Sequence, residues 1–200
     1  MVASLMSALP GSVAQGLIWG ILAIGVYITY KVLDFADLTV DGSLATGGAV
    51  AVMCMLNGAN TYVALILAFL AGMLAGLVTG LFHTALGIPP ILAGILTQLG
   101  LYSINMRIMG KANQAISVMQ YDVLVSHACL LTTGFCIVII ALLYWFFGTE
   151  IGASVRATGC NPNMARAQGI NTNATKVLGL VISNGLVGLA GALYAQYQGS

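Results

Sequence analysis

The sequence is poor in charged residues. Only 6% of its 200 residues are Asp, Glu, Lys or Arg, whereas a soluble domain carries about 25%. Four stretches contain none of these residues: 1–30, 42–106, 123–149 and 177–200. The shortage excludes a soluble globular domain. The net charge of +1 gives no support for a nucleic-acid partner.

Patterns that bind metals or form disulfides are also missing. The four cysteines form no CxxC pair, and isolated cysteines in apolar segments usually act as small hydrophobic residues. His83 and His127 lack the spacing of metal ligands. We therefore expect no metal site, no cofactor and no structural disulfide. The N-terminus has no basic region typical of a secretory signal, so no cleaved peptide is expected.

Long hydrophobic segments dominate what is present. Hydrophobic residues make up 60% of the chain, and a membrane-spanning helix needs about 20 apolar residues. We predict an all-α, polytopic transmembrane helix bundle that forms one domain over residues 1–200. Its six segments are expected at 12–32, 43–57, 61–82, 89–106, 124–147 and 175–196.

The second segment is short and follows a polar stretch, residues 33–43. This stretch is either an ordinary loop or a break in the helix at membrane depth, as in many transporters. Asp34 and Asp37 could line a pathway there, but a solvated loop is the favoured interpretation for both. The depth of the stretch in the membrane stays open.

Small residues recur every four positions in the third segment, which puts them on one helix face. The residues are Ala64, Ala68, Gly72, Gly76 and Gly80, and shorter repeats include Gly16 with Gly20 and Gly185 with Gly188 and Ala192. We interpret them as helix-packing surfaces. Gln98 and Asn184 lie inside apolar segments, where hydrogen bonding between helices is favoured over lining a pathway.

A polar island, residues 150–176, separates the last two segments. Basic residues mark cytoplasmic loops, and alternating crossings predict that the island is cytoplasmic and the N-terminus external. The basic residues expected on the cytoplasmic side are Lys31, Arg156, Arg166 and Lys176, against Arg107 and Lys111 outside.

The island contains helix-boundary signals. Asn161 followed by Pro162 is typical of a helix start, and Gly169 of a helix end, which predicts a short helix at 162–168. A second helix is expected at 151–158, ended by Gly159. A two-turn helix is unstable alone in water, so it must lean on the bundle or on a partner.

The island resembles the coupling loop of ABC-importer permeases in the branched-chain amino acid and ribose permease family, approximately G-x-x-x-R-A-x-G-x-N-P-x-x-A-R-x-x-G-I. The residues that match are Gly152, Arg156, Ala157, Gly159, Asn161, Pro162, Ala165, Arg166, Gly169 and Ile170. The D-L-T-V-D-G-S turn at 37–43 and the G-x-x-x-L-A-G-A run at 185–192 are also similar to the family. The resemblance covers about residues 12–196.

The resemblance implies a permease that dimerises with a second copy in the plasma membrane of a prokaryote, with homodimer or heterodimer left open. Cytoplasmic ATP-binding subunits and an extracytoplasmic solute-binding protein would be its partners. The segment 161–169 would be the coupling helix. The residues expected to couple to the ATPase are Arg156, Gly159, Asn161, Pro162, Ala165, Arg166 and Gly169. The substrate pathway is expected to include Asp41, Gly42, Ser43, Gln98 and Asn184.

The predicted function is therefore the permease subunit of an ABC importer, not an enzyme, for a small polar solute: an amino acid first, a sugar second. The sequence has no GxxxxGK[ST] phosphate loop, in keeping with ATP hydrolysis on other subunits. A self-sufficient channel or secondary carrier is the alternative. An intramembrane serine protease is disfavoured, because the stretch 152–155 departs from GxSG at its last position. Family members are longer, so we expect the chain to be truncated at its C-terminus.

Overall fold

The computed structural model describes residues 2–110 and 128–198. Within these two ranges the chain forms helices and no strand, which confirms the all-α prediction. The elements are α1 (Val2–Tyr27), the π-helix η1 (Ile28–Val32), α2 (Val40–Leu56), α3 (Thr61–Thr84), α4 (Pro90–Met109), α5 (Ala128–Gly148), α6 (Glu150–Cys160), α7 (Pro162–Ala167) and α8 (Thr172–Gln198).

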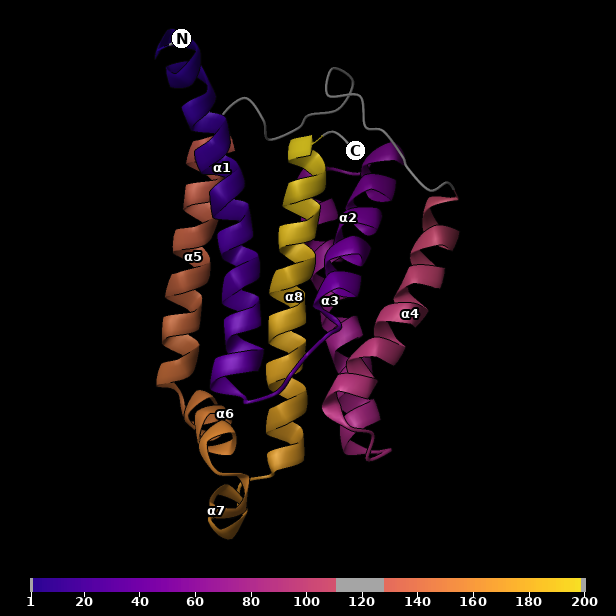
Figure 1. Cartoon of the computed structure of the whole chain (residues 1–200), viewed down its shortest axis with the longest axis vertical. Coiled ribbons are helices and arrows are strands. Elements are labelled where there is room, and N and C mark those ends of the chain that lie inside the picture. The colour runs from indigo at the N-terminus through magenta and orange to yellow at the C-terminus, as the bar shows by residue number, and fades with distance from the viewer. Residues whose placement is uncertain (1, 111–127, 199–200) are drawn as a thin grey trace.

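The long helices run along one axis, and α8 lies at the centre of the bundle (Figure 1). It packs against α3, α2 and α1, while α4 packs on α2 and α3, and α5 on α1. The short helix α6 packs beside one end of the bundle, and α7 projects beyond that end, which we call the α7 end. Between η1 and α2 the chain passes in front of α8, rising from this end towards the middle of the bundle.

In the described part of the chain, four helices are long and apolar enough to cross a membrane: Gly11–Val32, Thr61–Thr84, Pro90–Met109 and Thr172–Gln198. A fifth is added if the pair Thr132–Gly148 and Glu150–Cys160, bent by 80°, counts as one span. The helix α2 has 17 residues and is too short for that test. The prediction of a short second segment is therefore confirmed, and a break of the helix at membrane depth stays a prediction. Part of the predicted fifth segment, residues 124–127, lies outside the described residues.

Small residues let α3 approach α8 closely. A Cβ atom at Gly72 would collide with the backbone carbonyl of Asn184, and one at Gly76 with that of Leu180. The stripe predicted on the third segment thus faces α8, as expected for helix packing in membranes. Within the described residues, a Cβ atom at Gly16 or Gly20 in the first segment would meet nothing within 4 Å, so that repeat packs on no described helix, and its role as a packing surface stays a prediction.

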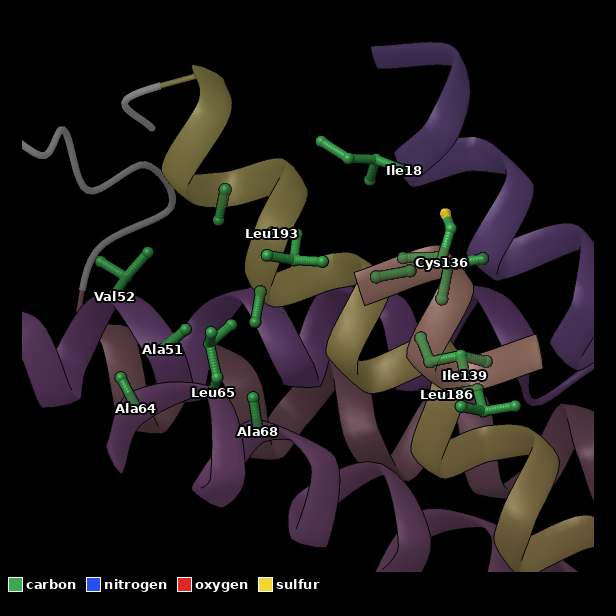
Figure 2. Packing of buried hydrophobic residues seen from close by; sticks show 14 of the residues in the cluster. Ile18, Ala51, Val52, Ala64, Leu65, Ala68, Cys136, Ile139, Leu186 and Leu193 are labelled. Carbon is green, nitrogen blue, oxygen red and sulfur yellow. The ribbon is translucent and has the colours of Figure 1, made fainter. Parts of the chain in front are cut away.

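The side chains that fill the bundle are mostly small or aliphatic. Figure 2 shows Ala64, Leu65 and Ala68 of α3 near Leu193 of α8, with α2 and α5 contributing to the same cluster. Large side chains instead cover the outside: Tyr144 is 85% exposed, Trp145 70% and Tyr102 67%. Small residues inside and large apolar residues outside suit a bundle whose solvent is lipid.

Candidate functional site

The break between α1 and α2 is held in a defined conformation. Leu33 N–H donates to Ile28 O at 3.0 Å, and Phe35 N–H donates to Thr29 O at 2.9 Å. Between them, Asp34 adopts a left-handed conformation, with φ of +52°, which Asp tolerates better than most residues. Leu33 and Phe35 are each 2% exposed. The irregular stretch 33–39, which we call the crossover segment, is therefore anchored by its own side chains.

A hydrogen-bonded clasp ties the crossover segment to α8. Asn184 Nδ2 donates to Asp37 Oδ2 at 2.7 Å, and Asn184 Oδ1 accepts from Ser43 Oγ at 2.6 Å. The second Nδ2 hydrogen goes to Leu180 O at 3.1 Å. Asn184 is fully buried, and its amide is fully engaged within the protein. We call Asp37, Ser43 and Asn184 the Asn184 clasp.

A chain of hydroxyl groups joins the same segment to α3 and α4. The hydroxyls of Thr39 and Thr79 are 2.7 Å apart, and Thr79 Oγ1 donates to Thr97 Oγ1 at 3.0 Å. Thr39 and Thr79 are completely buried. Threonine hydroxyls can both donate and accept, so these three satisfy one another in an apolar bundle. With the Asn184 clasp, they connect the crossover segment and α2 to α3, α4 and α8.

The structure groups the predicted pathway residues only in part. Ser43 and Asn184 share a hydrogen bond, and a Cβ atom at Gly42 would lie 3.2 Å from the Cα of half-buried Gln98. The Asp41 side chain is exposed in the first turn of α2. The preference for hydrogen bonding between helices is confirmed for Asn184. A pathway role for these residues stays a prediction.

Sequence reasoning missed Asp37, Thr39, Thr79 and Thr97. Asp37 was expected in a solvated loop; instead it is half-buried, and its other oxygen, Oδ1, accepts from Thr39 N–H at 2.8 Å. Asp two residues before Thr at a helix start is typical of an Asx turn, and this local signal could have drawn attention to it. The contacts of Thr79 and Thr97 have no comparable signal in the sequence.

The predicted short helix is α7, and both of its ends carry the expected caps. Asn161 Oδ1 accepts from the backbone N–H groups of Asn163 and Met164, each at 3.1 Å. Gly169 has φ of +82°, and Ile170 N–H donates back to Ala165 O at 3.1 Å, which is a Schellman-type helix end. The helix ends at Ala167, one residue before the predicted end.

The helix α6 does not end at Gly159 as predicted; it continues to Cys160. A Cβ atom at Gly159 would collide with the carbonyl of Val32 at the end of η1. The glycine therefore allows close approach between α6 and η1, and does not terminate the helix. At its other end, α6 is capped by Thr149, whose hydroxyl accepts from Gly152 N–H at 3.3 Å.

The predicted coupling residues fall into two groups. Ala165 is buried and Gly159 half-buried, so both pack within the protein. The others are exposed: Arg156, Asn161, Pro162, Arg166 and Gly169. Met164, which sequence reasoning did not single out, is 62% exposed on α7. Arg166 Nε donates to Thr172 Oγ1 at 2.8 Å, which ties α7 to the first turn of α8.

Basic residues gather at the α7 end. Lys31 lies in η1, Arg156 in α6, Arg166 in α7 and Lys176 near the start of α8. Arg107 lies in the last turn of α4, at the opposite end of the bundle (Figure 1). The predicted separation of the basic residues is confirmed for these five, and Lys111 lies outside the described residues.

Comparison with known proteins agrees with this arrangement. A family model described as "Branched-chain amino acid transport system / permease component" matches residues 9–200, so the chain belongs to that family. It is a multi-pass membrane permease subunit by family and by its apolar helices.

Three relatives show the range of similarity. The chain is 42% identical to a "Tyrosine transport system permease protein" of Clostridioides difficile (strain R20291) over 97% of its length and 66% of the relative's. It is 36% identical to an uncharacterized protein of Rickettsia prowazekii (strain Madrid E) over 97% and 70% of the two chains. A "Probable branched-chain amino acid transport permease protein LivH" of Methanocaldococcus jannaschii is 27% identical over 92% and 64%.

The chain thus spans about two thirds of the length of these curated relatives. No solved structure matches it.

Proposed function

We propose that the chain is the transmembrane permease subunit of an ABC importer that moves a small polar solute, with an amino acid as the first choice. Family membership and the names of the relatives, which mention tyrosine and branched-chain amino acids, support this. The structural observation that most supports this proposal is the position of α7. This capped, two-turn helix projects from the basic end of the bundle with Met164 and Arg166 exposed.

In this proposal, the α7 end faces the cytoplasm, and α7 docks into a cytoplasmic ATP-binding subunit. ATP hydrolysis takes place on that subunit. Displacement of α7 reaches α8 through the bond between Arg166 and Thr172, and α8 carries Asn184 of the clasp that holds the crossover segment. A second permease copy and an extracytoplasmic solute-binding protein complete the importer, in the plasma membrane of a prokaryote.

Docking is tested by co-purification with the cognate ATP-binding subunit. We expect Arg166→Glu and Met164→Asp to abolish capture, because each places negative charge on the exposed surface of α7. Arg107→Glu is the matched control, since it makes the same charge change at the opposite end of the bundle, and its capture should equal that of the wild type. Unchanged capture by both α7 variants would overturn the proposal.

A self-sufficient channel or secondary carrier is the competing function. It is distinguished by flux in proteoliposomes that contain the wild-type chain with and without the ATP-binding subunit. The proposal expects uptake of labelled amino acid only when ATP, the ATP-binding subunit and the binding protein are all present. Flux of the same rate without them would favour the carrier. Competition by unlabelled tyrosine, leucine and ribose would then rank the solute classes.

A further inference from the structure

We propose that His83 is a positioning residue that couples the first turns of α8, and through them α7, to the crossover segment. The proposal rests on the proposed importer function and adds a residue that lies in neither the coupling loop nor the expected pathway. His83 lies in the last turn of α3, at the α7 end of the bundle. Its ring contacts three other parts of the chain.

The two ring nitrogens have different partners. Nδ1 lies 2.9 Å from Ile88 O, and Nε2 lies 3.3 Å from Lys176 Nζ. A carbonyl only accepts hydrogen bonds and an ammonium only donates them. Nδ1 must therefore carry the proton, and Nε2 accepts from Lys176. One neutral tautomer satisfies both contacts, so the ring is fixed between the α3–α4 connection and α8.

The ring also contacts the crossover segment. His83 and Phe35 meet edge to face, with centroids 5.1 Å apart and planes at 79°. Phe35 is 2% exposed, and its backbone N–H donates to Thr29 O at 2.9 Å. A shift of the imidazole ring would therefore be felt by the anchored part of the crossover segment, because a close-packed interior transmits displacement.

The His83 ring is also connected to α7, through the first turns of α8. Thr172 and Lys176 are four residues apart on α8, which places them on one helix face. Thr172 Oγ1 accepts from Arg166 Nε of α7 at 2.8 Å, and Lys176 donates to His83 one turn further along. A continuous series of contacts thus runs from Arg166 through the first turns of α8 and His83 to Phe35.

The chain offers variants that separate the two kinds of contact. His83→Gln loses the ring against Phe35, but its amide can donate to Ile88 O and accept from Lys176. His83→Phe keeps an aromatic ring against Phe35 but loses both hydrogen bonds. Lys176→Met removes only the donor, and Lys176→Arg retains a donor.

The test uses the full complex with ATP-binding subunit and binding protein, in proteoliposomes with labelled tyrosine. Uptake, ATP hydrolysis, subunit co-purification and melting temperature are measured for each variant. We expect His83→Phe and Lys176→Met to keep the subunits together but to reduce the amount of solute moved per ATP by at least about fivefold, the lower end of typical coupling between sites. His83→Gln, which loses the ring contact with Phe35, should show a similar reduction, whereas Lys176→Arg should keep the wild-type value. The His83→Phe/Lys176→Met double variant should be no worse than either single variant.

If His83→Phe moves as much solute per ATP as the wild type, the role assigned to His83 is overturned, while the proposed importer function is not affected. The same role is overturned by a loss that merely follows a lower melting temperature, or by a failure of Lys176→Arg to keep coupling, since a purely structural role gives those results. Wild-type transport per ATP in His83→Gln would overturn the route through Phe35. If the wild-type complex shows no ATP-dependent uptake of tyrosine, leucine or ribose, the proposed function fails and this assignment fails with it. The outcomes are distinguishable because only the last involves the unmodified chain.

Discussion

Two regions hold α8 in the bundle, and they do so by different physical means. Along its middle, α8 meets α3 through glycine: the backbone of Asn184 lies against Gly72, and that of Leu180 against Gly76. The second region consists of polar side chains: it begins at the same level with the side chain of Asn184 in the clasp, and it extends to the contact between Lys176 and His83 at the α7 end. We call the first region the glycine seam.

The difference separates a rigid contact from one that can be rearranged. The glycine seam depends on the absence of side-chain atoms, and any added atom must displace backbone. The polar contacts depend on pairing, and a hydroxyl or amide can exchange one partner for another at modest cost. We therefore interpret the seam as the frame of the bundle and the polar contacts as the part through which movement of α7 can act.

The largest effect is expected from filling the seam. In Gly72→Val the new side chain would collide with the Asn184 carbonyl, and overpacking of this kind costs about 3 kcal/mol or more at the upper end of its range. We expect a large drop in the melting temperature of the purified protein in detergent. Gly20→Val is the matched control, because a Cβ atom there meets nothing within 4 Å. Equal melting temperatures for the two variants would mean that the seam is not a rigid contact.

A smaller effect is expected from removing the clasp. Asn184→Leu leaves Asp37 and Ser43 without their buried partner, and an unsatisfied buried polar group costs about 1–3 kcal/mol. We expect a lower melting temperature and faster hydrogen exchange in residues 33–39. Asp41→Asn, at an exposed position of α2, should change neither. If exchange in residues 33–39 stays at the wild-type rate, the clasp does not hold the crossover segment.

The smallest effect on the whole protein is expected at α7. Asn161→Ala removes the acceptor for two backbone N–H groups, and loss of such a cap costs about 1 kcal/mol. Because α7 projects from the bundle, we expect faster hydrogen exchange in residues 162–167 with an unchanged melting temperature. Asn163→Ala is the control, since the exposed side chain there does not cap the helix. A lower melting temperature of the whole protein would show that α7 contributes to the stability of the bundle.

The sequence predicted α7 well and the roles of some glycines poorly. Asn161, Pro162 and Gly169 act on backbone groups within a few residues, so their meaning can be read locally. Gly159 was misread because termination of a helix and close approach of another backbone both favour glycine. The repeat of Gly16 and Gly20 meets no described helix, since a small-residue face identifies a packing surface but not the partner that covers it.

Composition and local spacing by themselves determined that this chain forms a membrane-embedded helix bundle with a short second segment and a short capped helix. The reason is that transfer of apolar residues into lipid and capping of helix ends depend on the residue and its near neighbours. Only the tertiary structure decided which polar groups meet: Asp37 and Asn184 are 147 positions apart, and His83 and Lys176 are 93 apart. Such pairs form because the bundle buries them together, and a polar group in an apolar interior is stable only when it finds a partner.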